Sequence, residues 1–191
     1  RTLGGMYFVN NIEHDKLVEK SRRSVLVNFL ACLPFLLYVL VSLLVMEGFA
    51  INPETGEVFV QQGKYLANLL DVPVILVLLL AGLLLVVYGV LATSVLKKDH
   101  GIWFGGTGTV LTGLAIFFLA GFNNTPFYPS TADLQSSLSI ANASSSHYTL
   151  TVMTYVAMAV PFVLAYIAYV WKLMNARKLS LEDVAADDKA Y

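Results

Sequence analysis

The fold is decided by residues 72–96, which read VPVILVLLLAGLLLVVYGVLATSVL. The run contains no Asp, Glu, Lys, Arg or His, and it exceeds the roughly 20 apolar residues that a helix needs to cross a bilayer. Backbone amides and carbonyls in lipid have no water to bond, so such a segment is stable there only as a helix. The stretch therefore predicts a transmembrane helix.

The composition of the whole chain agrees with this assignment. Of its 191 residues 57% are hydrophobic and only 13% are charged, which is too little charge to cover a soluble domain of this size. The net charge of −1 gives no sign of a nucleic-acid partner, and we expect none. The one cysteine, Cys32, lies in an apolar run, which excludes an intrachain disulfide and a thiolate metal cluster within this chain.

Three further segments are long and apolar enough to cross a membrane. Together the four predicted spans cover residues 25–46, 72–96, 102–122 and 148–174. We expect an all-α integral membrane protein in which these four helices form one bundle over residues 25–174. A lead-in at 1–24 and a tail at 175–191 complete the predicted organisation. Because the chain opens on Arg1 rather than Met, we also expect it to be a piece of a longer protein.

The positively charged residues predict the orientation of the spans. They gather before the first span, in the turn between the second and third, and after the fourth: Lys16, Lys20, Arg22, Arg23, Lys97, Lys98, Lys172, Arg177 and Lys178. The other two connections hold one cation between them, Lys64. Four alternating spans put every cation-rich flank on one face, so we expect both termini to be cytoplasmic. The polar link at residues 123–151 is then extracytoplasmic.

The spans offer little for chemistry. None of them holds an ionisable side chain in its apolar body, which argues against a proton relay, a voltage sensor or a charged-substrate site made from these helices alone. The three histidines, His14, His100 and His147, lie at or beyond span ends, and the first two are expected on the opposite face from the third. Met153 and Met158 are better read as packing residues than as haem ligands. We predict no catalytic, cofactor or metal site in this chain.

Small residues at four-residue spacing predict close helix packing. They recur in three of the spans, at Gly105, Thr109 and Gly113, at Gly89 and Thr93, and at Ala157, Pro161 and Ala165. Serines before the fourth span, Ser145 and Ser146, have the chemistry to cap its first free N–H groups. Uncharged Ser, Thr and Asn in the polar link can satisfy backbone groups locally, so we expect an ordered lid rather than a spacer.

The polar link also carries a resemblance. PFYPST at 126–131 and SLSIANASSSHYTLTVMTYVA at 137–157 resemble the region before the last helix of subunit II of cytochrome bd-type quinol oxidases. Arg1-Thr2-Leu3-Gly4 and LSLEDV at 179–184 resemble two further boxes of that family. Ala141-Asn142 departs from it, because the family usually has Trp-Asp there.

The resemblance implies a fold and a setting. The chain would be the second four-helix bundle, half of an eight-helix subunit, in a bacterial or archaeal cell membrane. The complex would be a respiratory terminal oxidase that takes electrons from the quinol pool and reduces dioxygen to water. Its b-type haems and haem d would lie in subunit I. This chain would be a non-haem-bearing structural and assembly part, in contact with subunit I, the N-terminal half of subunit II and membrane lipids.

Two alternatives remain open from the residues alone. The glycine-rich start of the third span and Pro161 would suit half of a small-molecule transporter, whose broken helices build a binding site. A free-standing four-span adaptor protein is the other.

Overall fold

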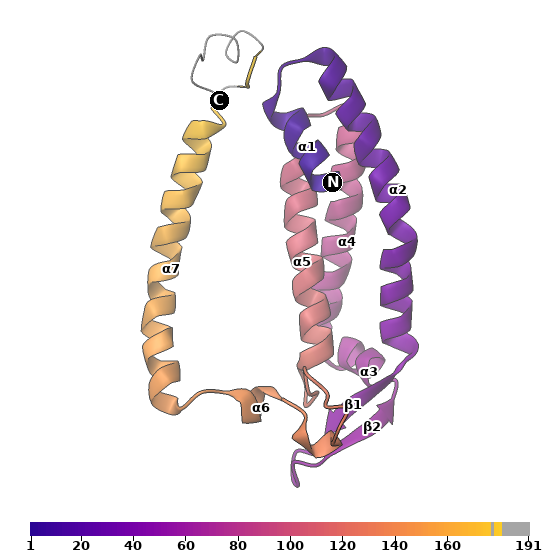
Figure 1. Ribbon diagram of the computed structural model, residues 1–191, viewed down its shortest axis with the longest axis vertical. Coiled ribbons are helices and arrows are strands. Elements are labelled where there is room, and N and C mark those ends of the chain that lie inside the picture. Colours follow the sequence, from indigo (N-terminus) through magenta and orange to yellow (C-terminus); the bar gives the residue numbers. More distant parts are fainter. Residues whose placement is uncertain (177, 181–191) are drawn as a thin grey trace.

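A computed structural model describes residues 1–176 and 178–180 of the chain (Figure 1). The elements are α1 (Thr2–Asn11), α2 (Asp15–Val45), β1 (Glu47–Ile51), β2 (Val58–Gln62), α3 (Lys64–Asp71), α4 (Pro73–Ser94), α5 (Gly101–Gly121), the 3-10 turn η1 (Leu134–Ser136), α6 (Ile140–Ala143) and α7 (His147–Met174). Among the described residues, α2, α4, α5 and α7 are long and apolar enough to span a membrane. The expected all-α membrane class with four spans is confirmed.

The first span is longer than its apolar part. α2 begins at Asp15, ten residues before the apolar run, because His14 caps it and accepts a hydrogen bond from the Leu17 amide at 3.3 Å. Its first turns therefore carry the charged residues that precede the membrane. Pro34 lies inside the helix without ending it.

Short helix α1 packs beside the spans. Met6 and Val9 of α1 are fully buried, and the Cα of Gly5 lies so close to Val25 of α2 that an added Cβ would sit 2.7 Å from a valine methyl. Met6, Val25 and Val90 form one small core where α1, α2 and α4 meet. The expected lead-in at 1–24 is thus helical over most of its length and in part packed against the bundle.

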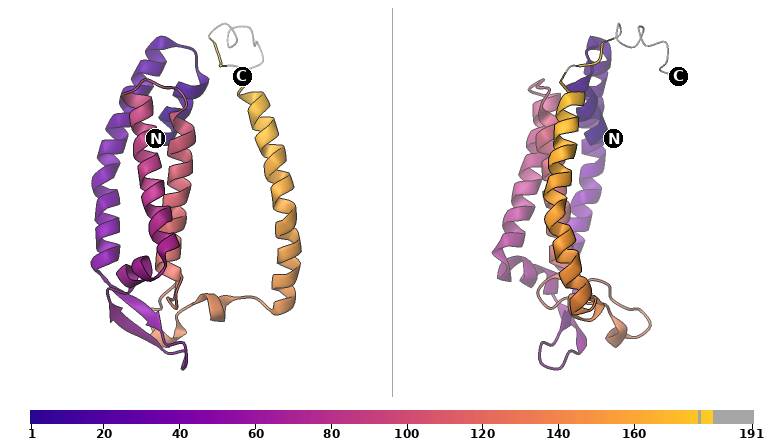
Figure 2. Two further views of the ribbon diagram at one scale, coloured as in Figure 1. Left: turned by 180° about the vertical axis from the view of Figure 1, so that it is seen from behind. Right: turned by 90° about the vertical axis from the view of Figure 1, so that its left-hand side faces the viewer.

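The closest packing in the molecule joins α4 to α5. A Cβ added to Gly89 would lie 2.5 Å from the Gly105 amide nitrogen, and one added to Gly82 would lie 2.6 Å from the Thr112 nitrogen. Glycine at these positions lets the two backbones touch, so the helices gain van der Waals contact with each other. The two helices run side by side in Figure 1 and in the left view of Figure 2.

A β-hairpin and α3 close the end of the molecule opposite the α1–α2 turn (Figure 1). β1 and β2 pair antiparallel, with Glu47 opposite Gln62 and Ile51 opposite Val58. The connecting turn uses Gly56 at φ +74°, where glycine costs least. The sequence carries a turn signal here, Pro53-Glu54-Thr55-Gly56, but it does not predict the paired strands. Behind the hairpin, Tyr65 and Leu69 of α3 pack into the second core with residues of α4 and α5.

The polar link between α5 and α7 is folded onto this hairpin. The Gln135 side chain accepts from the Val58 amide and donates to the Val58 carbonyl, both at 2.9 Å, as a neighbouring strand would. Tyr128 pairs with Leu138 in an antiparallel bridge. Asn142 and Ser139 form a capping box at α6, and the Asn142 amide also donates to the Ser137 carbonyl at 2.9 Å. An aspartate at this position could not make that last bond.

Helix α7 stands apart from the other spans (Figures 1 and 2). None of its residues is buried, although it is at least as apolar as α5. Near the α4–α5 turn its Trp171 meets Trp103 of α5, with ring centroids 6.4 Å apart. The four helices thus do not pack as one closed bundle within this chain: α2, α4 and α5 form the packed group, and α7 stands apart from them along most of its length. The space between α7 and the packed group is here called the opening.

The C-terminal tail is described in part. Leu179 pairs with Ile12, through hydrogen bonds of 2.9 Å from the Glu13 amide and 2.8 Å to the Asn11 carbonyl. Residues 177 and 181–191, which include most of the LSLEDV box and the rest of the expected tail, lie outside the described residues.

Candidate functional site

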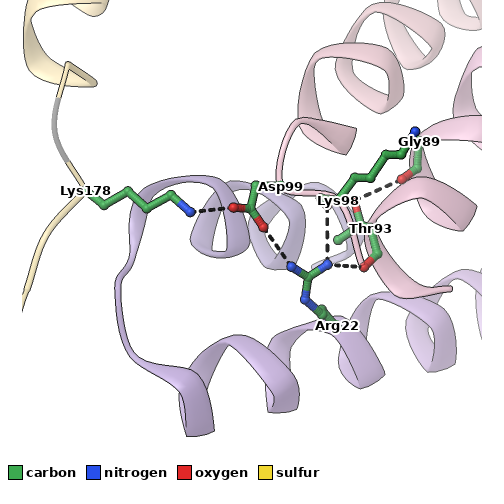
Figure 3. Close-up of polar contacts among 6 residues, drawn as sticks. All are labelled: Arg22, Gly89, Thr93, Lys98, Asp99 and Lys178. Atoms are coloured by element: carbon green, nitrogen blue, oxygen red, sulfur yellow. Dashed lines mark hydrogen bonds and ion pairs between the residues drawn. The ribbon is translucent and has the colours of Figure 1, made fainter. Parts of the chain in front are cut away.

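A buried arginine organises the end of the molecule opposite the hairpin, here called the cation-rich end. It is made of the α1–α2 turn, the α4–α5 turn and residues 172–176 and 178–180. Arg22 of α2 is 8% exposed and donates to the Thr93 carbonyl at 2.6 Å and the Lys98 carbonyl at 3.3 Å (Figure 3). The last carbonyls of a helix have no partner within it and carry the negative end of its dipole. Arg22 therefore closes the C-terminus of α4.

The same guanidinium starts a chain of charges. It donates to one carboxylate oxygen of Asp99 at 2.7 Å, and Lys178 donates to the other at 2.5 Å (Figure 3). These three side chains come from α2, the α4–α5 turn and the segment after α7, and we call them the charge latch. The latch joins the packed helices to the chain segment that follows α7.

The charge latch sets the protonation of its carboxylate. Burial acts to raise the pKa of Asp99, but the hydrogen bond and charge of Lys178, together with those of Arg22, outweigh it and leave the pKa below its ordinary value. Asp99 is therefore a carboxylate at neutral pH. A group held in this way serves as a fixed anchor and is a poor proton carrier near pH 7.

A second polar centre lies at the hairpin end. The fully buried Asn68 of α3 donates to the Leu119 carbonyl at 3.1 Å and to the Thr125 hydroxyl at 2.8 Å, and accepts from Asn123 at 3.2 Å. Asn123 and Asn124 both have positive φ. Asn tolerates this backbone region better than most residues. Asn68 thus fixes the sharp exit of the chain from α5, where the polar link begins.

The small residues singled out in the sequence fall into two groups. Gly89 and Thr93 face α5, and Gly105 lies between Gly89 and the Met6 side chain. Thr109 is exposed and bonds its own helix, and an added Cβ at Gly113 would meet nothing within 4 Å. The seam that touches α4 therefore runs through Gly101, Gly105, Gly108 and Thr112.

The remaining predicted positions lie on α7. Ala157 and Ala165 are exposed. Ser146 is the N-cap residue of α7, and its hydroxyl accepts from the Thr149 amide at 3.4 Å. Ser145 is exposed, and no capping bond is found for it in the described chain.

The described residues do not fit a haem. His14 uses its Nδ1 as a helix cap, and His100 stacks edge-on against Phe104 with centroids 5.9 Å apart. Met153 and Met158 are 65% and 62% exposed on α7. No group of three or more His, Cys, Asp or Glu in the described part of the chain could hold a metal ion.

The sequence alone does not reveal the structural roles of three residues. Arg22 reads as one of several orientation cations, Asn68 as part of a polar connection, and Gln135 as one polar residue among many. A signal exists for Arg22 alone: it lies within three residues of the apolar body of α2, where an unpaired cation is expensive. For the other two, the partners are distant in sequence.

Comparison with known proteins agrees with the fold. The chain matches the family described as cytochrome bd terminal oxidase subunit II over residues 1–174. It is 32% identical over 138 residues to the cytochrome bd-I ubiquinol oxidase subunit 2 of Escherichia coli K12, and equally to those of strains O6:H1 and O157:H7. The match covers 71% of this chain and 35% of each relative, so the chain spans about a third of the relatives' length. With four apolar helices and a match over residues 1–174, the chain belongs to the cytochrome bd terminal oxidase subunit II family.

Proposed function

We propose that this chain is the structural, non-haem-bearing second half of subunit II in a membrane quinol oxidase. The whole complex oxidises quinol and reduces dioxygen to water, with b-type haems and haem d held by subunit I. The chain lies in the cell membrane with the cation-rich end in the cytoplasm, because lysine and arginine favour that side. Its task is to complete the assembly and to shield it from lipid and water.

The observation that carries this proposal is the bare length of α7. Because no residue of α7 is buried, both its inner face, toward α5, and its outer face are open to packing by other protein segments. Tyr148, Tyr155, Phe162 and Tyr169 recur every seven residues and are 62–78% exposed. A repeat of seven keeps side chains on one side of a helix and is typical of helix–helix packing. Tyr169 and Trp171 are two residues apart, so this stripe points away from the α5 side.

The tyrosines favour a protein partner for this outer face. The Tyr155 Cα lies about 12 Å along the helix from the start of α7, inside the expected hydrocarbon layer. A hydroxyl in hydrocarbon is costly unless it is hydrogen-bonded. Within the described residues no bond is found for the Tyr155 hydroxyl, so an adjoining subunit is the natural source of an acceptor.

The inner face of α7 suits the missing part of subunit II. Ala157 lies seven residues before Leu164, which faces the opening, so the alanine is on the same side. Small residues allow a helix to approach closely. Gly113 of α5 lies outside this surface, because it lines a separate cavity with residues of α1, α2 and α4.

The first test of this proposal is optical. A complex purified through a tag on this chain should show the visible absorption of reduced haem d and b-type haems. A stable but colourless preparation would contradict the oxidase assignment and favour a transporter or adaptor.

A second test separates structure from catalysis. Ala157→Leu should lower the amount of haem d-bearing complex in membranes and leave turnover per haem d unchanged. Val156→Leu, one residue away on another side of α7, is the matched control and should assemble normally. Normal haem d content with reduced turnover in Ala157→Leu would overturn the structural role.

A further inference from the structure

The narrow part of the opening between α7 and the packed helices contains a hollow. A cavity of about 580 Å³ is lined by α1, α5 and α7, and a second of about 640 Å³ adjoins it along α7 and the segment that follows α7. The two share Asn10, Trp103, Trp171 and Asn175 as lining residues. We call the joint space the tryptophan groove. It lies at the cation-rich end, where the only two tryptophans of the chain meet.

The groove is closed to a helix at this level. Helices pack with their axes 8–10 Å apart on each side, so a helix between two others needs twice that separation. The indole rings of α5 and α7 instead approach to 6.4 Å. Asn11 donates to Asn175 at 2.7 Å and ties α1 to the end of α7. Only a thin, flexible chain or a small headgroup can enter.

The two ends of the groove differ in chemistry. Toward the membrane interior it is lined by apolar and small residues of α5 and α7, such as Val110, Leu164 and Ile167. At its mouth stand Lys172, Lys178 and the amides of Asn10 and Asn175. Lys172 has no ion-pair partner among the residues that the structure describes. An apolar slot with a cationic, amide-bearing mouth matches a molecule with a hydrocarbon tail and an anionic head.

The charge balance at the mouth supports an anion. Lys178 and Arg22 together face one carboxylate, Asp99, which leaves the charge latch with an excess of positive charge. Lys172 adds a further cation beside it. Trp103 and Trp171 are 58% and 47% exposed. Their indole N–H groups are hydrogen-bond donors suited to the headgroup level of the membrane.

We propose that the tryptophan groove binds one anionic phospholipid. Its phosphate accepts hydrogen bonds from Lys172 and the amides at the mouth, and an acyl chain lies between α5 and α7. The lipid fills space that no helix can reach and joins α7 to the packed helices at this end. This site is independent of the quinol oxidase proposal, since it requires only that the chain spans a membrane.

The experiment uses the intact complex reconstituted in phosphatidylcholine vesicles that contain a small fraction of photoreactive phosphatidylglycerol. Irradiation followed by peptide mapping should place the label on α5 near Gly106–Val110 and on α7 near Leu164–Trp171. Unlabelled phosphatidylglycerol should compete with the probe, and phosphatidylcholine should not. Raising the salt concentration should weaken labelling, because exposed charges are screened.

Variants make the assignment specific. Lys172→Gln should lower the probe's apparent affinity roughly fivefold, since one lysine near a membrane surface contributes about 1 kcal/mol. Lys97→Gln removes the same charge at the same end but outside the groove, and should leave labelling unchanged. Gly106→Leu should displace the label by filling the groove, whereas Gly106→Ala should not, because an added Cβ there meets nothing within 4 Å.

Three outcomes would overturn the proposal. One is equal labelling by photoreactive phosphatidylcholine, which would mean ordinary surrounding lipid. Another is cross-linking of the two groove walls to a segment of another subunit, which would mean a protein occupant. The third is equal labelling of the Lys172→Gln and Lys97→Gln complexes. The amount of intact complex recovered by size-exclusion chromatography shows whether a variant failed to assemble, and the groove-filling pair then decides the question.

Discussion

Helices α5 and α7 are similar in sequence character and different in surroundings. Both are apolar, both carry small residues at four-residue spacing, and both are long enough to span a membrane. Yet α5 lies with its backbone against that of α4, while no residue of α7 is buried. Whether the side chains of a membrane-spanning helix become buried depends on whether its small residues meet a matching helix surface, because lipid itself solvates apolar side chains. α5 finds that surface within the chain, and α7 is held at its ends.

The most sensitive point of the packed group should be Arg22. Arg22→Met removes the partner of the Thr93 and Lys98 carbonyls and of Asp99, and should lower the free energy of unfolding by about 3 kcal/mol, near the lower end for a broken buried ion pair because Asp99 is partly exposed. Arg23→Met, the exposed neighbour, should change it little. Thermal unfolding of the solubilised complex measures both, and equal midpoints would contradict the role of Arg22.

The α4–α5 seam comes next. Gly89→Ala places a methyl 2.5 Å from a backbone nitrogen of α5, which cannot move aside without separating the helices. We expect a loss of about 2 kcal/mol in the free energy of unfolding. Gly113→Ala makes the same change on α5 where nothing lies within 4 Å, and it should be neutral in the same assay. If both variants behave alike, the close contact does not hold the helices together.

The polar link, which joins α7 to the hairpin, should contribute less to stability than the α4–α5 seam. Gln135→Ala removes two hydrogen bonds to Val58 and should release the polar link by about 1 kcal/mol, with little effect on the spans. Hydrogen exchange at the Val58 amide should speed up. Gln61→Ala, an exposed change on the same strand, is the control. Unchanged exchange at Val58 would show that the link is held by other contacts.

At the cation-rich end, the contact between Lys178 and Asp99 in the charge latch should weaken at acid pH. The folded-state pKa of Asp99 lies below its ordinary value of 3.8, so its contribution to stability is present above that value and is lost as pH falls through the lowered one. Between pH 7 and about pH 5 the contact of Lys178 with Asp99 should therefore not change. Asp99→Asn should remove the acid-dependent part. Hydrogen exchange of the Leu179 amide as a function of pH tests this, and a transition near neutral pH would contradict it.

Much of this fold can be read from the sequence. The spans predicted at 72–96, 102–122 and 148–174 agree within two residues at each end with α4, α5 and α7, because long apolar runs have few alternatives in lipid. α2 starts earlier than predicted, since its polar first turns are stabilised by a cap and not by hydropathy. The hairpin strands were missed, because their polar arms carry no alternation strong enough to indicate pairing.

The parts that sequence could not supply depend on long-range contacts. The hydropathy of α7 resembles that of α5, so it does not indicate whether α7 packs against its own chain. The register of the α4–α5 seam also escaped, since Gly108 and Thr112, rather than Thr109 and Gly113, face α4. One turn of a helix offers several small residues, and only the partner decides which of them is used.

The end tethers of α7 also have a topological consequence. The polar link fixes one end of the helix to the hairpin, and the Asn175, Lys178 and Leu179 contacts fix the other, so the chain forms a ring around the opening. A helix that already carries folded ends cannot be threaded through a closed ring. Any segment that passes through the ring from one face to the other must therefore be in place before the Asn175, Lys178 and Leu179 contacts close it. Forming those contacts would then be a late step in building the complex.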